Sequence, residues 1–408
     1  MNKTQQYFLN ILKASLRGES FVPAEDIPGE AWEQIMKLAG EHQVLPMIFD
    51  ACYALPGFRG TPAQAAVRQQ VMREVFLQTR KTGEFLQLYR TLRLAGVKPL
   101  VVKGIICRNL YPQPDYRASS DEDVLIPKGQ FNLCHETMLA FGMETSEEPE
   151  RFDRMYEIPY GKKGSPIYIE LHKQLFPPES DAYGDLNAYF EGIFDRAVTE
   201  EIGGAAVLTM APTDHLFYLI CHAFKHFLHG GFGIRQVCDI VLFAQRYRDQ
   251  IQWIRVWENC RQIRADKFAS AMFRMGRNYL GLEVELPDFW QTDVDEIPML
   301  EDLLASGIYG GADMERKHSS NITLNAVARQ KHGKDTGGGV FRSLFPGVRE
   351  LDVRYPYLKK YPFLLPLAWI SRFFRFLFRK GGADSAAKTI QLGNERIELM
   401  KQYGILDE

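Results

Sequence analysis

The most constraining feature of this sequence is a short alternation of strand and helix patterns in its first half. Residues 97–104, "VKPLVVKG", form a run rich in β-branched residues that ends in glycine, and residues 121–127, "DEDVLIP", form a second run closed by proline. Residues 165–177, "SPIYIELHKQLFP", alternate apolar and polar side chains as a third strand would. Helix patterns separate the three runs. This order predicts a small α/β or α+β domain.

Helical patterns flank this domain on both sides, with apolar residues at three- and four-residue spacing. A glycine-rich stretch, 332–347, indicates a linker, and the chain beyond it is basic and aromatic. We expect an α+β fold in which a small mixed β-sheet core is flanked by N- and C-terminal helical regions. The predicted regions are an N-terminal helical region (1–95), the α/β core (96–210), a helical domain that closes the cleft (211–330), and a linker with basic aromatic C-terminal helices (331–408).

The composition is that of an ordinary globular protein, with 46% hydrophobic and 25% charged residues. Because the net charge is −2, there is no overall basic field, and we expect no long nucleic acid as a partner. The six cysteines form no CxxC pair, and the N-terminus has helical spacing rather than the pattern of a signal peptide. We therefore expect free thiols, no structural zinc and a cytoplasmic location.

No stretch reaches the ~20 apolar residues that a membrane-spanning helix needs. The segment 361–380 comes closest, but prolines and arginines interrupt it. Its residues Arg372, Arg375 and Arg379 recur at helical spacing among aromatic side chains. A basic amphipathic helix can lie on an anionic membrane surface, although such helices more often cover a core or meet a partner. Peripheral membrane contact by this segment is the less favoured interpretation.

Two acidic residues stand on one face of the second predicted strand. In a strand, residues i and i+2 project from the same face with Cα atoms roughly 6.6 Å apart, so Asp121 and Asp123 converge while Glu122 points away. Two carboxylates held this close repel each other unless a cation lies between them or one is protonated. Mg²⁺ is the natural cation, because it prefers oxygen ligands and binds through carboxylates together with substrate phosphates.

Glu170, on the alternating strand "YIELH", could supply a third carboxylate. Three acids can hold two metal ions ~3.5–4 Å apart, which stabilises both the attacking and the leaving oxygen of a phosphoryl transfer. Mn²⁺ is an alternative to Mg²⁺. The competing interpretation is an acidic strand end that is simply solvated, with Glu170 facing water.

Upstream of the acids, Lys103 and Gly104 lie where a strand turns into a helix. Backbone N–H groups at a helix start can receive phosphate, glycine permits close approach, and lysine adds a point charge. Arg117 precedes Asp121 on the intervening loop, where it could neutralise phosphate or form a salt bridge with the acidic strand.

A cluster of histidines marks the helical region after the predicted core. His222, His226 and His229 are spaced i, i+4 and i+7, so they lie along one helix face. A zinc site lacks a further ligand at a matching step. The remaining interpretations are packed histidines, or a cleft wall in which Lys225, His226 and Arg235 contact phosphate or acceptor. Asp239 is placed to pair with Arg235 at i+4.

In their order and spacing, these motifs resemble an uncharacterised bacterial nucleotidyltransferase-like family with the polymerase-β-type nucleotidyltransferase fold. The resemblance spans roughly residues 30 to 270. The residues that carry it are Lys103, Gly104, Tyr111, Arg117, Asp121, Glu122, Asp123, Val124, Leu125, Glu170, Leu171, His172, His222, Lys225, His226, Arg235 and Asp239.

The resemblance implies a metal-dependent transfer of a nucleoside monophosphate from a nucleoside triphosphate to an acceptor hydroxyl. Asp121 and Asp123 match the two metal-binding carboxylates of the fold. Glu170 matches the third, which helps the acceptor oxygen attack the α-phosphate. Gly104 lies where the fold has its Gly-Ser turn. The acceptor stays open between small molecules, proteins and other hydroxyl donors.

The sequence departs from the pattern of the fold at two positions. Ile105 follows Gly104 where the fold has serine, so a hydroxyl contact to phosphate is missing. Glu122 stands between the two aspartates where the fold favours an apolar residue, which predicts a strand end less buried than usual. Both departures support an alternative: a catalytically degenerate protein of the same fold that binds a nucleotide or a partner.

Overall fold

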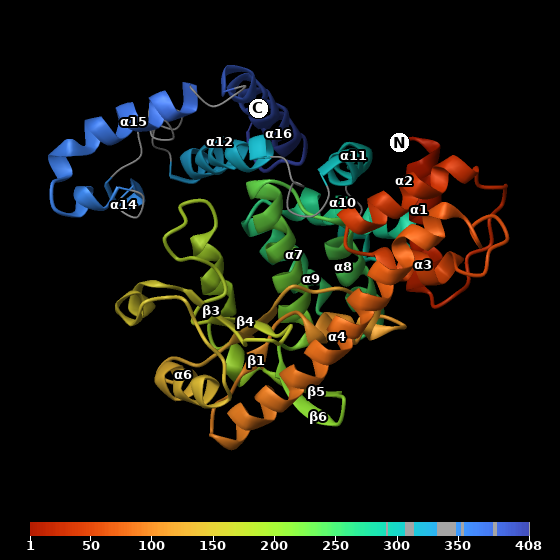
Figure 1. The fold of residues 1–408 in the computed structure, drawn as a ribbon, viewed down its shortest axis with the longest axis horizontal. Helices are drawn as coiled ribbons and strands as arrows, with labels where there is room; N and C mark the ends of the chain where they lie inside the picture. Colours follow the sequence, from red (N-terminus) through yellow and green to blue (C-terminus); the bar gives the residue numbers. More distant parts are fainter. Residues whose placement is uncertain (291–292, 307–313, 333–347, 352–354, 378–381, 408) are drawn as a thin grey trace.

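The computed structural model describes residues 1–290, 293–306, 314–332, 348–351, 355–377 and 382–407. A four-stranded sheet lies at its centre, in the order β1-β2-β4-β3. The strands are β1 (Leu100–Val101), β2 (Glu122–Leu125), β3 (Glu157–Gly161) and β4 (Tyr168–His172). β2 and β4 are parallel, whereas β1 and β3 are antiparallel to their neighbours, so the sheet is mixed. The predicted α+β class is confirmed, with helices on either side of a small mixed sheet (Figure 1).

The sequence patterns did not predict two elements of this core, β3 and the hairpin of β5 and β6. β3 carries the sequence "EIPYG", whose proline and glycine disguise it as a loop. The hairpin of β5 (Val198–Ile202) and β6 (Ala205–Thr209) turns at Gly203 and Gly204, both with positive φ. Its strands lie next to the long helix α4, where Leu208 N–H donates to the Tyr89 hydroxyl over 2.7 Å.

Helix α4 (Pro62–Leu94) is the long support of the sheet. It begins at Thr61, whose side chain accepts a hydrogen bond from Gln64 N–H, and proline occupies its first position, where no N–H is needed. It ends before Gly96, which has a φ of 90° that favours glycine. Its C-terminal half packs apolar side chains against the sheet together with α6 (Phe131–Ala140).

The N-terminal helices and the helices after the sheet share one hydrophobic core. These elements are α1 (Lys3–Leu16), α2 (Gly29–Glu41), α3 (Leu45–Cys52), α7 (Pro212–His229), α8 (Ile234–Arg246), α9 (Trp253–Gln262), α10 (Asp266–Tyr279), α11 (Ile297–Ser306), α12 (Met314–His332) and α16 (Gly382–Gln402). Phe8 on α1, Phe224 on α7 and Phe268 on α10 are among its buried side chains. The predicted domain boundaries stay predictions, but this core joins residues that they would separate.

Short elements complete the described chain. They are α5 (Ile105–Arg108), α14 (Val348–Leu351), α15 (Leu365–Leu377) and the 3-10 helices Pro114–Tyr116, Pro149–Arg154, Gly184–Phe190, Ile193–Asp195, Asp288–Trp290, Pro356–Lys359 and Pro362–Leu364. The six cysteines are buried and free, as predicted.

The C-terminal segment contributes α15, which exposes Leu367 and Ile370, and the 3-10 helix before it exposes Phe363. The side chains of Arg372, Arg375 and Arg379, on which the membrane-surface interpretation depends, lie outside the described residues. Among the helices that the structure describes, none has the length and hydropathy to cross a bilayer.

Candidate active site

The acidic residues gather on the sheet face that looks toward α7. The parallel register places Asp123 beside Glu170 and Leu125 beside His172, so these side chains project from the same face. Asp123 is 3% exposed, whereas the side chain of Glu170 is 29% exposed. Asp121 precedes the strand and is partly exposed. The structure therefore brings Asp123 and Glu170 together, as the strand patterns predicted.

His172 joins the two carboxylates and was missed as a site residue. One ligand atom from each of Asp123, Glu170 and His172 lies within 4.8 Å of the others, a group able to hold a metal ion. Nε2 of His172 donates to Oδ1 of Asp123 over 3.3 Å and lies 3.9 Å from Oε2 of Glu170. The available signal was the i+2 spacing from Glu170, which puts both side chains on one strand face.

The other ring nitrogen of His172 also has partners. Nδ1 lies 3.2 Å from the Gln174 carbonyl oxygen and 3.6 Å from Oε2 of Glu157. Burial lowers the pKa of His172, but the hydrogen bond to Asp123 and the surrounding carboxylates outweigh this effect and raise it. The ring therefore lies among three carboxylates that favour its protonated form.

The two central carboxylates have different proton affinities. Burial raises the pKa of Glu170 to about 7, and the charges of Asp123 and Asp121 add to the effect. Burial acts in the same direction on Asp123, but the Lys103 ammonium and His172 outweigh it and hold the pKa of Asp123 well below its usual range. At neutral pH Asp123 is therefore charged, while Glu170 exchanges protons readily.

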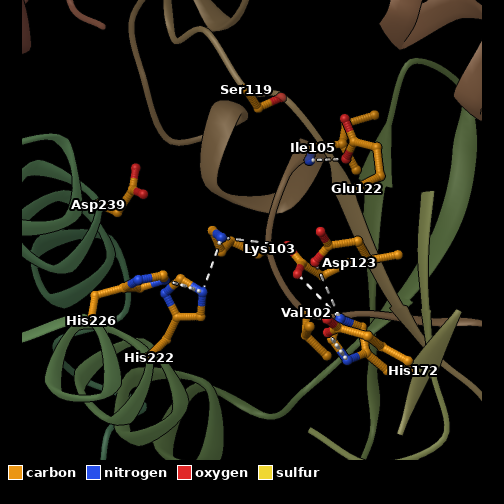
Figure 2. A network of polar contacts seen from close by, with 12 residues as sticks. Val102, Lys103, Ile105, Ser119, Glu122, Asp123, His172, His222, His226 and Asp239 are labelled. Atoms are coloured by element: carbon orange, nitrogen blue, oxygen red, sulfur yellow. Dashed lines mark hydrogen bonds and ion pairs between the residues drawn. The ribbon is translucent and has the colours of Figure 1, made fainter. Parts of the chain in front are cut away.

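Lys103 connects the acidic face to α7 (Figure 2). Its Nζ lies 3.5 Å from Oδ2 of Asp123 and donates to Nε2 of His222 over 3.2 Å. A second histidine continues the contact, because Nε2 of His226 lies 3.3 Å from Nε2 of His222. Lys103 thus contacts Asp123 on the acidic strand and His222 on the histidine face of α7.

Lys225 and His226 are half-buried on α7. Nζ of Lys225 lies 5.9 Å from the centroid of the Tyr156 ring. Burial, together with the neighbouring ammonium groups, holds the pKa of His222 and His226 well below 6.5, so both rings are neutral at physiological pH. Within the described residues, the α7 histidines form no metal-binding group of their own.

Gly104 makes the turn between β1 and α5, and its shape depends on Glu122. Gly104 has a φ of 53°, and a β-carbon placed there would meet Oε2 of Glu122 at 1.9 Å. The same carboxylate oxygen accepts the Ile105 N–H over 2.7 Å, as Figure 2 shows. The first amide of the predicted phosphate turn is therefore used by a protein carboxylate.

Glu122 is fully buried, so the prediction of a less buried strand end is wrong. Nη1 of Arg108 lies 2.6 Å from Oε1 of Glu122, and Nζ of Lys81 lies 3.9 Å from it. Both cations also bind Ser119, through its hydroxyl and its carbonyl oxygen respectively. Two cations compensate one buried acid, and the solvated-acid interpretation fails for this strand.

The same network holds the loop that leads to Asp121. Ser119 N–H donates to the side chain of Gln78 on α4 over 2.9 Å. The sequence patterns did not identify three residues that hold this loop: Gln78, Lys81 and Arg108. Their only signal was a polar side chain on the buried face of a helix, which is rare without a partner.

Arg117 and Arg235 contact protein groups rather than the acidic face. Arg117 is 1% exposed, and its guanidinium binds Asp239 through two hydrogen bonds of 2.7 and 2.5 Å. Nη1 of Arg235 donates to the side chain of Gln43 over 2.6 Å and to the Ala118 carbonyl oxygen. Arg117 therefore binds Asp239 rather than the acidic strand, and Arg235 acts on Asp239 through its charge.

Tyr111 joins Arg117 and Asp239 in a second polar cluster, because its hydroxyl donates to Oδ1 of Asp239 over 2.7 Å. The cluster ties the loop before the acidic strand to α8. It therefore connects the sheet to the helices that face it.

Comparison with known families agrees with this geometry. The sequence model of the family described as "Uncharacterised nucleotidyltransferase" matches residues 28–281, more than half of the chain. This protein belongs to that family, and the resemblance drawn from the motifs is confirmed over nearly the same span. No curated protein and no solved structure matches the chain.

Proposed function

We propose that this protein is a metal-dependent nucleotidyltransferase that moves a nucleoside monophosphate from a nucleoside triphosphate to an acceptor hydroxyl on a small molecule or a protein. One observation carries the proposal: Asp123 and Glu170 are register partners on adjacent parallel strands, on the face where Lys103 links Asp123 to His222 of α7. Family membership supports the same reaction class.

The residues present fit a divalent metal ion. Oδ2 of Asp123 is buried and accepts no hydrogen bond from any group in the described part of the chain, so it is available to a cation. Asp123 and Glu170 would hold the ion, with Asp121 at the open edge. Their oxygens suit Mg²⁺, and a nitrogen from His172 would favour Mn²⁺. When bound, the ion supplies Lewis-acid polarisation of the α-phosphate, and a second ion would do the same for the leaving oxygen.

The transfer is an in-line displacement. The acceptor oxygen forms a bond to the α-phosphorus while the bond from that phosphorus to the bridging oxygen breaks, and pyrophosphate leaves with the electron pair. The acceptor proton goes to Glu170, the more exposed of the two central carboxylates. Asp123, which is bound by His172, stays charged and fixes the reacting groups in position.

The phosphates would be held from the α7 side. Lys103, Lys225 and His226 would contact them, and Gly104 shapes the turn that carries Lys103. The predicted phosphate contacts of Arg117 and Arg235 are left out of this proposal, because their guanidinium groups are buried and bound to protein.

A second function has one observation in its favour. The Ile105 amide is bound to Glu122, and no serine follows Gly104, so the turn offers phosphate less than the fold usually provides. A degenerate protein that binds a nucleotide or a partner without chemistry would have this turn.

Incubation with a nucleoside triphosphate labelled at the α-phosphate, Mg²⁺ or Mn²⁺, and a mixture of cell metabolites and proteins separates the two functions. We expect metal-dependent pyrophosphate release with label on an acceptor, and at least a ~100-fold loss in Asp123→Asn. Nucleotide binding without turnover would favour the degenerate protein. Glu296→Gln, a change at a carboxylate that binds Arg274 and Asn278, is the matched control.

A further inference from the structure

Lys103 contacts both walls of the site, the acidic strand face and α7. On one side its ammonium lies 3.5 Å from Oδ2 of Asp123, and on the other it donates to His222 over 3.2 Å. The side chain is buried, and Figure 2 shows it between the acidic strand and α7. Its charge therefore neutralises the same carboxylate oxygen that a divalent cation would need.

An ammonium group and a divalent cation compete for this oxygen. Oδ2 of Asp123 has no hydrogen bond within the described residues, so Lys103 neutralises it by charge alone. A doubly charged ion interacts more strongly with a buried carboxylate than a single ammonium group does, and it repels that group at the same time. Lys103 must therefore leave Asp123 when the carboxylate takes such an ion.

The residues around Lys103 determine which partner its ammonium group can take after it leaves Asp123. His222 and His226 are neutral and can share hydrogen bonds without adding charge. Lys225, half-buried on the same helix, adds a second ammonium group to this wall. Once a divalent ion occupies Asp123, Lys103 and Lys225 form a pair of ammonium groups near which Glu157 remains as a carboxylate. A compact multiply charged anion is the ligand that balances the rest of their charge.

The other side of the turn is closed to such an anion. Oε2 of Glu122 already accepts the Ile105 N–H, so this amide does not bind phosphate. The anion site thus lies on the α7 wall rather than at the helix start.

We propose that Lys103 exchanges partners, leaving Asp123 for the pyrophosphate portion of the bound triphosphate when a divalent ion takes Asp123. This inference rests on the proposed function. It makes metal and phosphate binding cooperative: each ligand strengthens the other, because each removes part of the cost that the second would meet alone.

Mn²⁺ binding, followed by electron paramagnetic resonance with and without inorganic pyrophosphate, tests the exchange. Equilibrium dialysis, corrected for the Mn²⁺–pyrophosphate complex in solution, gives the coupling factor. In the unchanged protein we expect pyrophosphate to strengthen Mn²⁺ binding by about tenfold or more. Lys103→Met should bind Mn²⁺ alone more tightly than the unchanged protein, by about threefold or more, and its coupling factor should fall close to one.

Lys103→Gln repeats the test if the methionine variant does not fold. Lys331→Met, which removes a remote lysine bound to Asp185, is the matched control and should behave like the unchanged protein. If either variant at position 103 binds Mn²⁺ no more tightly than the unchanged protein, or keeps the full pyrophosphate coupling, the exchange is refuted while the metal site stands. Failure of Mn²⁺ to bind any variant, with or without pyrophosphate, overturns the proposed function itself.

Discussion

A β-carbon on Gly104 would lie 1.9 Å from Oε2 of Glu122, the oxygen that accepts the Ile105 N–H. The turn after β1 and the acidic strand β2 are therefore built as one unit. Glu122, the residue that breaks the expected acidic motif, determines the shape of the turn that carries Lys103.

Gly104→Ala should destabilise the protein through both the clash and the positive φ. We expect a loss in the free energy of unfolding of about 3 kcal/mol, measured by urea denaturation. Gly204→Ala is the matched control, because Gly204 has a φ of 68° but open space around its missing side chain. It should cost only about 1 kcal/mol. Equal losses in the two variants would contradict the close contact with Glu122.

Glu122→Gln should also be costly, since it leaves Arg108 and Lys81 buried beside a neutral group. We expect a loss of about 3–5 kcal/mol in the free energy of unfolding, the range for breaking a buried ion pair from one side. Glu296→Gln, whose partner Arg274 is half in solvent, should lose about 1 kcal/mol or less. A loss near zero for Glu122→Gln would restore the solvated-acid interpretation.

The Arg117–Asp239 pair can be tested by a double-mutant cycle. Arg117→Met and Asp239→Asn should each destabilise the protein by about 3 kcal/mol or more, because each leaves a buried group without its partner. Together they should cost clearly less than the sum, with a coupling of about 1–3 kcal/mol in urea denaturation. Additive losses would show that the two side chains do not interact.

The stability of the protein should fall in mild acid. Burial lowers the pKa of His42 and of His215 to about 4, well below the ordinary value of 6.5. Between pH 6.5 and pH 4 the unfolded chain binds protons at these histidines that the folded protein does not. The contribution of the two neutral histidines to the free energy of unfolding is therefore fully present above pH 6.5 and is lost as the pH falls toward 4.

Each of these histidines should contribute up to ~3 kcal/mol to that loss. His42→Gln should flatten the pH dependence of the melting temperature between pH 7 and 4. An unchanged slope in this variant would show that His42 is not buried in its neutral form.

The sequence allowed the central pair of the site to be predicted, because strand alternation is local. The strand faces of Asp123 and Glu170 followed from the period of two residues, whereas their side-by-side register comes from the parallel pairing of β2 with β4. His172 lies on the same face by the same rule, yet nothing in the pattern distinguished it as a partner of Asp123.

Long-range partners could not be predicted from the pattern. The burial of Glu122 on β2 depends on Lys81, which lies far back in the chain on helix α4. Arg117 likewise pairs with Asp239 on α8. Local spacing favoured Arg235 as the partner of Asp239, but tertiary packing brought a different guanidinium closer. β3 was missed for a local reason, since proline and glycine interrupt its strand pattern.

We propose above all that Asp123 and Glu170 hold a divalent metal ion together with a nucleoside triphosphate. A crystal of the protein soaked with Mn²⁺ and a non-hydrolysable triphosphate, recorded at the manganese absorption edge, tests it most directly. We expect an anomalous peak bonded to oxygens of both carboxylates, with the phosphates against the α7 wall. A bound nucleotide with no manganese at these carboxylates, or manganese bound elsewhere, would contradict the account.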